Sequence, residues 1–199
     1  MAQLTLNTTF DATDVLAFRA KLKADRERMG LNNITINDIV LYAVSRTVLN
    51  HKDCNAHFYD DKIVYFKNAN IGMAVDTPRG LLVPTVFHAN KMSLNELAQT
   101  TKALGASAQE GTISPDLLQG GTITVSNLGT MGIESFTPVI NPPQTCILGV
   151  DTIMDKVRVV DGEIKAYKAI GLSLTFDHRA LDGAPAARFL KELVKNLEN

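Results

Sequence analysis

The hydrophobic period of this chain switches several times between that of an α-helix and that of a β-strand, at irregular intervals. Residues 36–48 follow the helical period of 3.6, from residue 55 the period moves towards two, and the last third is mostly strand-like. Helical and strand patterns are interleaved without the regular spacing of a doubly wound parallel sheet. They therefore predict an α/β chain in which helices pack on a mixed β-sheet, as in an α+β two-layer sandwich.

Capping residues and changes of period place the individual elements. The expected helices are one between 11 and 30, one over 36–48 capped by Thr35 or Asn37, one opened by a capping box of Ser93 and Glu96, a short turn capped by Ser114, and one from about Ala184. The expected strands are 56–59 and 63–66 as a hairpin, 69–75 and 81–87, 122–126, 145–150, 156–160 and 163–167 as a second hairpin, and 169–176.

The segment 127–143 is expected to be an ordered irregular loop, because apolar residues recur along it. These expected anchors are Met131, Ile133, Phe136, Val139 and Ile140.

Composition excludes several classes of function. The formal net charge is −1, which gives no electrostatic argument for binding nucleic acid. No apolar stretch is long enough to span a membrane, and the N-terminus lacks the pattern of a secretory signal peptide. Cys54 and Cys146 form neither a disulfide framework nor a metal motif, and Gly-rich phosphate loops are absent. We therefore expect an intracellular chain without a metal, with both cysteines as buried thiols.

His178 has the setting of a catalytic histidine, unlike the other three histidines, His51, His57 and His88. It lies in a charged turn between a predicted strand and the final helix. That turn can hold one ring nitrogen in a hydrogen bond and leave the other free. Asp177 and Asp182 in the same turn also fit purely structural roles as turn and capping residues, so local physics leaves both interpretations open.

Ser126 is the second candidate, because it ends a predicted strand just before the irregular loop. A hydroxyl at such a position can donate a hydrogen bond to a developing oxyanion. It can equally bond to nearby backbone, which is the more common arrangement for serine.

The turn from Asp177 to Gly183, with sequence DHRALDG, resembles the DHRxxDG motif of the dihydrolipoyl acyltransferases of 2-oxoacid dehydrogenase complexes. Three further blocks resemble that family in the same order along the chain: VDTPRGLLVP at 75–84, VSNLG at 125–129 and INPPQ at 140–144. Chloramphenicol acetyltransferase is a more distant relative of similar fold, whose motif typically has a second histidine at the position of Asp177.

The resemblance implies acyl transfer, most simply of acetyl, between dihydrolipoamide and coenzyme A. It implies that His178 is the general base, that Ser126 donates to the oxyanion and that Asp182 orders the histidine turn. The residue types suit this chemistry, because a neutral imidazole can accept the proton of a thiol near pH 7. Direct transfer in a ternary complex needs neither cysteine, since both reacting sulfurs belong to the substrates.

The resemblance also implies a homotrimer with active sites at its subunit interfaces, assembled further into a cubic or icosahedral core. Implied partners are a lipoyl domain and the dehydrogenase and dihydrolipoamide dehydrogenase components, in the cytoplasm or, in a eukaryote, the mitochondrial matrix. Residues 1–199 are expected to form one catalytic domain without the lipoyl and subunit-binding domains. The family's basic segment resembling RxxIAxxL is not found ahead of Leu4. This leaves the stability of a trimer open, and it leaves Arg19, Arg79 and Arg179 as alternative partners of Asp182.

Two other functions remain compatible with the sequence. One is a structural core that has kept the fold and lost efficient catalysis. The other is an O-acetyltransferase of the chloramphenicol type. Turnover of acyl-coenzyme A with free dihydrolipoamide, compared with hydroxyl acceptors, distinguishes the three.

Overall fold

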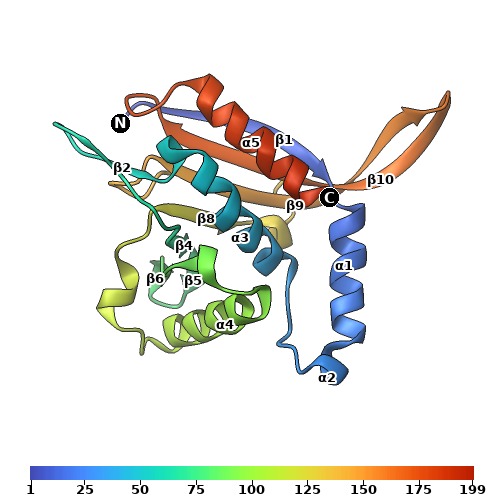
Figure 1. Cartoon of the computed structure of the whole chain (residues 1–199), viewed down its shortest axis with the longest axis horizontal. Coiled ribbons are helices and arrows are strands. Elements are labelled where there is room, and N and C mark those ends of the chain that lie inside the picture. Colours follow the sequence, from blue (N-terminus) through green and yellow to red (C-terminus); the bar gives the residue numbers. More distant parts are fainter.

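A computed structural model describes all residues, 1–199, as a sheet with helices packed on one face (Figure 1). Six strands pair in the order β1-β10-β9-β8-β4-β7. Their bounds are β1 Gln3–Asp11, β4 Ile71–Met73, β7 Thr85–Val86, β8 Ile123–Asn127, β9 Cys146–Val160 and β10 Glu163–Asp177. Strand β8 is parallel to β4 and β9, whereas the other pairs are antiparallel. The expected mixed sheet is therefore confirmed.

Two short two-stranded ribbons and five helices complete the fold. The ribbons are β2 Ala56–Phe58 with β3 Ile63–Tyr65 and β5 Val75–Thr77 with β6 Gly80–Leu82. The helices are α1 Thr13–Ala24, α2 Arg26–Met29, α3 Ile36–Thr47, α4 Leu94–Glu110 and α5 Gly183–Leu197, and short 3₁₀ turns lie at 48–50, 52–54, 89–91, 115–118 and 129–131. No helix is both long and apolar enough to cross a membrane.

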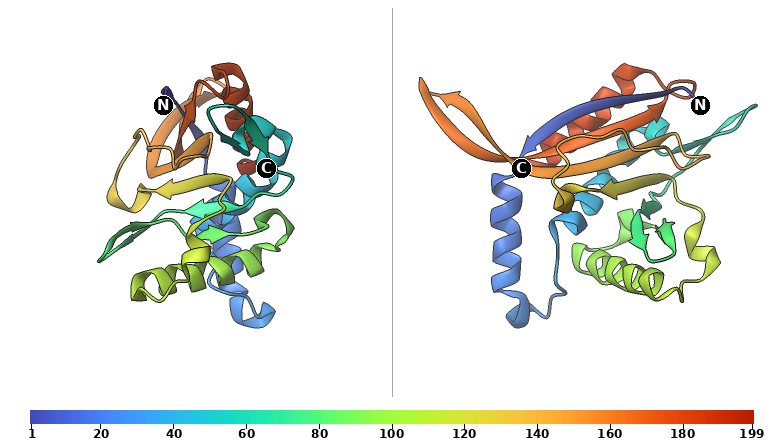
Figure 2. Two further views of the ribbon diagram at one scale, coloured as in Figure 1. Left: turned by 90° about the vertical axis from the view of Figure 1, so that its left-hand side faces the viewer. Right: turned by 180° about the vertical axis from the view of Figure 1, so that it is seen from behind.

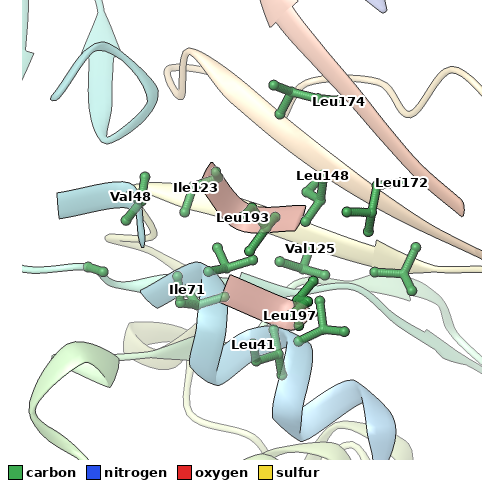
Figure 3. Close-up of a cluster of buried hydrophobic side chains, with 14 of the residues drawn as sticks. Leu41, Val48, Ile71, Ile123, Val125, Leu148, Leu172, Leu174, Leu193 and Leu197 are labelled. Carbon is green, nitrogen blue, oxygen red and sulfur yellow. The ribbon is translucent and has the colours of Figure 1, made fainter. Parts of the chain in front are cut away.

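The core lies between the helices and the front face of the sheet. Helix α3 contacts both α4 and α5, and α5 packs on β1 and β10. Alternate residues of the strands, such as Val125, Leu148 and Leu172, meet Leu41 and Leu193 of the helices in one cluster (Figure 3). Period-two alternation in the strands and period-3.6 stripes in the helices thus bury their apolar residues in the same layer.

The back face of the sheet is built from small and polar residues and is covered by the 127–143 loop. Thr175 and Ser173 are fully buried there although they are polar. The ring of Phe136 lies so close to Gly149 that a Cβ at this glycine would be 2.7 Å from it. The missing side chain at Gly149 therefore lets the loop pack directly on the sheet.

The ends of β9 and β10 continue past the rest of the sheet as a projecting hairpin (Figure 2). The turn lies at Asp161 and Gly162, both with positive φ, as the sequence predicts. The strands on each side are continuous over 15 residues each. The two predicted breaks within them, at 151–155 and at Lys168, are wrong, because both strands continue through these positions, with only an irregularity of the pairing at Asp151 and Thr152 opposite Gly171.

Three further predictions need correction. The chain opens with strand β1 rather than with helices, because β1 completes the sheet by pairing with β10. The predicted strand 69–75 is shortened to β4, and the predicted strand 81–87 is divided between β6 and β7. The residues between β4 and β7 form the separate β5–β6 ribbon instead of a simple turn. Ser114 makes no side-chain capping bond, although a 3₁₀ turn follows it at 115–118.

The remaining capping predictions are confirmed. Thr35, rather than Asn37, caps α3 in a box with Asp38, and Ser93 caps α4 in a box with Glu96. Of the predicted loop anchors, Ile140 is buried, but Met131, Ile133 and Val139 are exposed, and Val139 is 72% exposed. Apolar character alone did not distinguish side chains that face the sheet from those that face outwards.

Candidate active site

The histidine turn is held to the fold by backbone bonds and leaves its imidazole accessible. The backbone N–H of His178 donates to the carbonyl of Ala2 (2.7 Å), and that of Asp177 donates to the carbonyl of Thr145 (2.9 Å). The His178 side chain is 46% exposed. The turn thus presents a firmly anchored imidazole at the end of β10.

Asp177 holds the turn together from inside. Its side chain is only 2% exposed and accepts bonds from the Arg179 side chain at Nε (3.0 Å) and Nη2 (2.7 Å) and from the Arg179 backbone N–H (3.1 Å). The hydrogen bonds from the Arg179 side chain lower the pKa of Asp177, against the opposing effect of burial. The Arg179 guanidinium also lies over the ring of Phe58, 4.7 Å from its centre. Asp177 is therefore a structural carboxylate, fully paired within the chain.

Asp182 lies on the outside of the same turn. Its side chain is 83% exposed, and its Oδ1 is 3.6 Å from Nδ1 of His178, which is beyond ordinary hydrogen-bond distance. It is the N-cap residue of α5 but makes no side-chain capping bond. Neither ring nitrogen of His178 is hydrogen-bonded within the chain, so the expected bond to one of them is not formed here.

Ser126 lies near the end of β8, on the back face of the sheet. Its neighbour Val125 points into the core, and successive side chains of a strand point to opposite faces. Thr124 donates to Gln144 (2.6 Å) and Asn127 donates to Asn37 (3.0 Å), whereas the half-buried Ser126 hydroxyl has no partner within the chain. It is free to donate to a bound group.

Ser126 and His178 do not meet within one chain. Ser126 pairs with Gly149, which pairs with Ser173, and His178 follows five residues later along β10. Two strand spacings and five extended residues place their Cα atoms roughly 19 Å apart. Because β10 is antiparallel to β9 while β8 is parallel to it, the two residues lie at opposite ends of the sheet.

His51, His57 and both cysteines are engaged in the fold, whereas His88 is exposed. His51 Nε2 lies 2.8 Å from a carboxylate oxygen of Glu192, and His57 Nε2 lies 2.8 Å from the carbonyl oxygen of Gly121. Cys54 and Cys146 are free and buried, as predicted. No group of three or more His, Cys, Asp or Glu side chains is arranged to hold a metal ion.

One charged residue on the same face of the sheet as Ser126 was not singled out by the sequence analysis. Asp151 is buried on the same face of the sheet, two residues beyond Gly149. Burial raises the pKa of Asp151 to about 6, although a bond from Ser173 opposes the rise. The available signal was a lone aspartate directly after the apolar strand 146–150.

The whole chain, residues 1–199, matches the family described as 2-oxoacid dehydrogenases acyltransferase (catalytic domain). The chain belongs to this family. It is 39% identical over 197 residues to the dihydrolipoyllysine-residue acetyltransferase component of the acetoin cleaving system of Bacillus subtilis, covering 99% of this chain and 50% of that protein. The chain thus spans half the length of this curated relative.

Solved structures agree with the family in their fold. Dihydrolipoamide acetyltransferase of Azotobacter vinelandii, studied for the role of a serine, a histidine and an asparagine in its catalytic mechanism, gives a TM-score of 0.93 at 34% identity, covering 99% of this chain and 82% of that one. The cubic core of the pyruvate dehydrogenase multienzyme complex gives the same values. Chloramphenicol acetyltransferase, at a TM-score of 0.61, 14% identity and coverage of 98% and 88%, shares the fold. The predicted family and its chloramphenicol acetyltransferase-like fold are both confirmed.

Proposed function

We propose that this chain is an acyltransferase catalytic domain that moves an acetyl group between dihydrolipoamide and coenzyme A. The observation that carries the proposal is the pair Ser126 and His178. Each presents a free functional group at the surface of its own end of the sheet, in a chain of this acyltransferase family.

The roles follow from the chemistry of thioester exchange. His178 takes the proton of the incoming thiol, and the thiolate attacks the carbonyl carbon of the acyl thioester. The Ser126 hydroxyl donates to the oxyanion of the tetrahedral intermediate. Collapse of that intermediate expels the second thiolate, which recovers the proton from His178. No bond to the protein forms, so the acyl group passes directly from sulfur to sulfur.

A relative supports the assignment of these residues. In the Azotobacter protein, the interval between the serine and the histidine studied equals that between Ser126 and His178. Its asparagine follows the histidine at the same interval as Asp182 follows His178. Asp182 is then a positioning residue for the imidazole, and a carboxylate replaces an amide at that place.

The active site is formed between subunits of a homotrimer, with His178 of one chain facing Ser126 of another. The roughly 19 Å between these residues in one chain requires this arrangement if both act on one substrate. Exposed apolar side chains on the covering loop, such as Val139 and Met131, supply surface for such a contact. Assembly of trimers into a larger core, with a lipoyl group delivered by a separate domain, is the corresponding proposal for the complex.

Complementation between two inactive variants tests both the residues and their arrangement. His178→Ala and Ser126→Ala are co-expressed, and turnover of acetyl-coenzyme A with free dihydrolipoamide is measured on the purified trimer. In randomly mixed trimers, a quarter of the interfaces combine an intact histidine with an intact serine. Activity should therefore recover to about a quarter of that of the native enzyme. The two homotrimers are the controls. No recovery above the homotrimers would contradict a shared site, and an inactive native chain would contradict the proposed reaction itself.

A further inference from the structure

The hydroxyl of Ser126 has no partner within the chain, so only the backbone that carries it sets its position. Ser126 is the last residue but one of β8, and Asn127 is the last residue of β8 that pairs with β9. On its other side, β8 pairs with β4 only as far as Val125. The ends of strands open more easily than their middles. A fixed hydroxyl at this place therefore needs support beyond the pairing of the strands.

The side chain of Asn127 supplies such support. Its Oδ1 accepts the backbone N–H of Gly129 (2.9 Å), and its Nδ2 donates to Oδ1 of Asn37 in the first turn of α3 (3.0 Å). A single amide thus uses both its acceptor and its donor. It ties the end of β8 to the turn at 129–131 and to a helix 90 residues away along the chain.

The turn that Asn127 holds is itself packed on β9. A Cβ at Gly129 would lie 2.6 Å from the backbone carbonyl oxygen of Asp151, closer than Cβ contacts in proteins come. The backbone N–H of Leu128 also donates to the carbonyl of Val150 (3.0 Å). Because the obstacle at Gly129 is backbone, no side chain can move aside, and only glycine lets the turn lie this close. The segment after Ser126 is therefore anchored on α3 and on β9.

Asn127 and Ser126 face opposite sides of the sheet. Successive side chains of a strand point to opposite faces. Asn127 bonds to α3 on the side of the buried Val125, whereas Ser126 points to the back face. Asn127 can therefore affect a group bonded to the Ser126 hydroxyl only by fixing where that hydroxyl lies.

We propose that Asn127 is a positioning residue for the oxyanion donor Ser126, and that Gly129 completes its anchorage. A bond to a developing oxyanion depends steeply on distance and direction, so a small displacement of the donor lowers the rate far more than it weakens substrate binding. The proposal rests on the proposed function and adds a residue that does not contact the reacting atoms.

A double-mutant cycle tests whether Asn127 acts through Ser126. Asn127→Ala should reduce kcat for acetyl transfer about tenfold or more, with the KM of both thiols within about twofold of native. In the Ser126→Ala background the same substitution should have almost no further effect, because no hydroxyl is left to position. Equal fold losses in the two backgrounds would overturn the proposal even if the native chain is an efficient acetyltransferase.

Carboxylate variants separate the hydrogen bond from the size of the side chain. Asn127→Asp keeps the acceptor for Gly129, and the amide of Asn37 can turn to donate to it, so kcat should stay within about threefold of native. Asn37→Asp leaves an acceptor for Asn127 and should be equally mild. The two together place acceptors opposite each other, so the double variant should lose more activity than the product of the two single losses. A simple product would show that the bond to α3 does not matter.

Asn32→Ala is the matched control. The Asn32 side chain donates to Oδ1 of Asn95 in α4, also at 3.0 Å, and thus makes the same kind of link away from β8. Its loss should leave kcat unchanged. Gly129→Ala, which pushes the turn away from β9, should instead lower kcat as Asn127→Ala does, again with little change in KM. A native kcat for Gly129→Ala would contradict the proposed anchorage.

Hydrogen exchange tests the anchorage without turnover. In the free protein, Asn127→Ala should speed exchange of the amides of residues 126–129 about tenfold, whereas Asn32→Ala should leave them unchanged. If the native chain transfers no acetyl group, the proposed function fails while faster exchange still supports the anchorage. Unchanged exchange in Asn127→Ala overturns the anchorage whatever the activity.

Discussion

The sheet carries a buried aspartate near each candidate catalytic residue. The fold satisfies the hydrogen bonds of one of these carboxylates and leaves the other partly unsatisfied. At the His178 end, Asp177 is fully paired with Arg179, which lowers its pKa. At the Ser126 end, Asp151 has one bond, from Ser173, and burial raises its pKa to about 6. One carboxylate is satisfied within the chain, and the other has a buried oxygen without a partner.

The two aspartates therefore differ in how completely the fold accounts for them. Asp177 stabilises a turn that presents an exposed imidazole. At the His178 end, the carboxylate is fully paired, and only the imidazole has no partner within the chain. At the Ser126 end, the buried Oδ1 of Asp151 has no partner, so this end keeps an unsatisfied polar group within the fold. The five experiments below test this contrast, in order of decreasing expected effect.

Removing the imidazole should have the largest effect on rate. His178→Ala is expected to reduce kcat by about 10²–10⁴-fold, the usual contribution of a general base, and to leave the proposed trimer intact because the turn is held by backbone bonds. Steady-state acetyl transfer and sedimentation measure the two properties. Turnover within a few-fold of the native enzyme would show that the proton goes elsewhere.

Removing the hydroxyl should have the next largest effect. Ser126→Ala is expected to lower kcat by about 10²–10³-fold with little change in the KM of either thiol, since the bond to the oxyanion exists only in the transition state. Thr124→Val, on the same strand and face, is a control for packing, although it also loses a bond to Gln144. If KM rises while kcat holds, Ser126 binds the substrate rather than the oxyanion.

Neutralising the unpaired carboxylate should stabilise the fold. A raised pKa means that the folded state binds the proton more tightly, so stability falls as pH rises from about 4 to about 6. Asp151→Asn removes this penalty and should raise the free energy of unfolding by up to about 3 kcal/mol at pH 7, with no gain near pH 3. Denaturant unfolding at both pH values measures it. A loss of stability at pH 7 would mean that the charge is already satisfied.

Neutralising the paired carboxylate of Asp177 should lower the free energy of unfolding at neutral pH. A lowered pKa stabilises the fold above the unfolded value near 3.9, and this contribution is lost as pH falls through the lowered pKa. Asp177→Asn should therefore cost about 2 kcal/mol at pH 7 and progressively less below pH 4. Arg179→Gln should give a similar profile. A pH-independent cost would assign the effect to packing rather than to the ion pair.

Sequence reasoning located the catalytic candidates and missed the buried Asp151. Capping boxes and periodicity are local, so they predicted α3 with a cap at Thr35 or Asn37 and α4 with its cap at Ser93. Strand β1 was missed because its place depends on pairing with β10, more than 150 residues away. Asp151 follows an apolar strand, and its burial depends on Gly171 of another strand, which no local pattern shows.

Asp182 should have the smallest effect of the residues in the histidine turn. Its carboxylate is 83% exposed and 3.6 Å from the imidazole, where solvent screens the interaction, and its side chain makes no capping bond. We expect Asp182→Ala to reduce kcat less than about tenfold. Asp182→Asn, which introduces the residue type of the Azotobacter protein at this interval, should stay close to native. A loss above 100-fold for alanine with an active asparagine variant would show that assembly encloses this side chain. The His178 end would then be completed by the neighbouring subunit as well as by substrate.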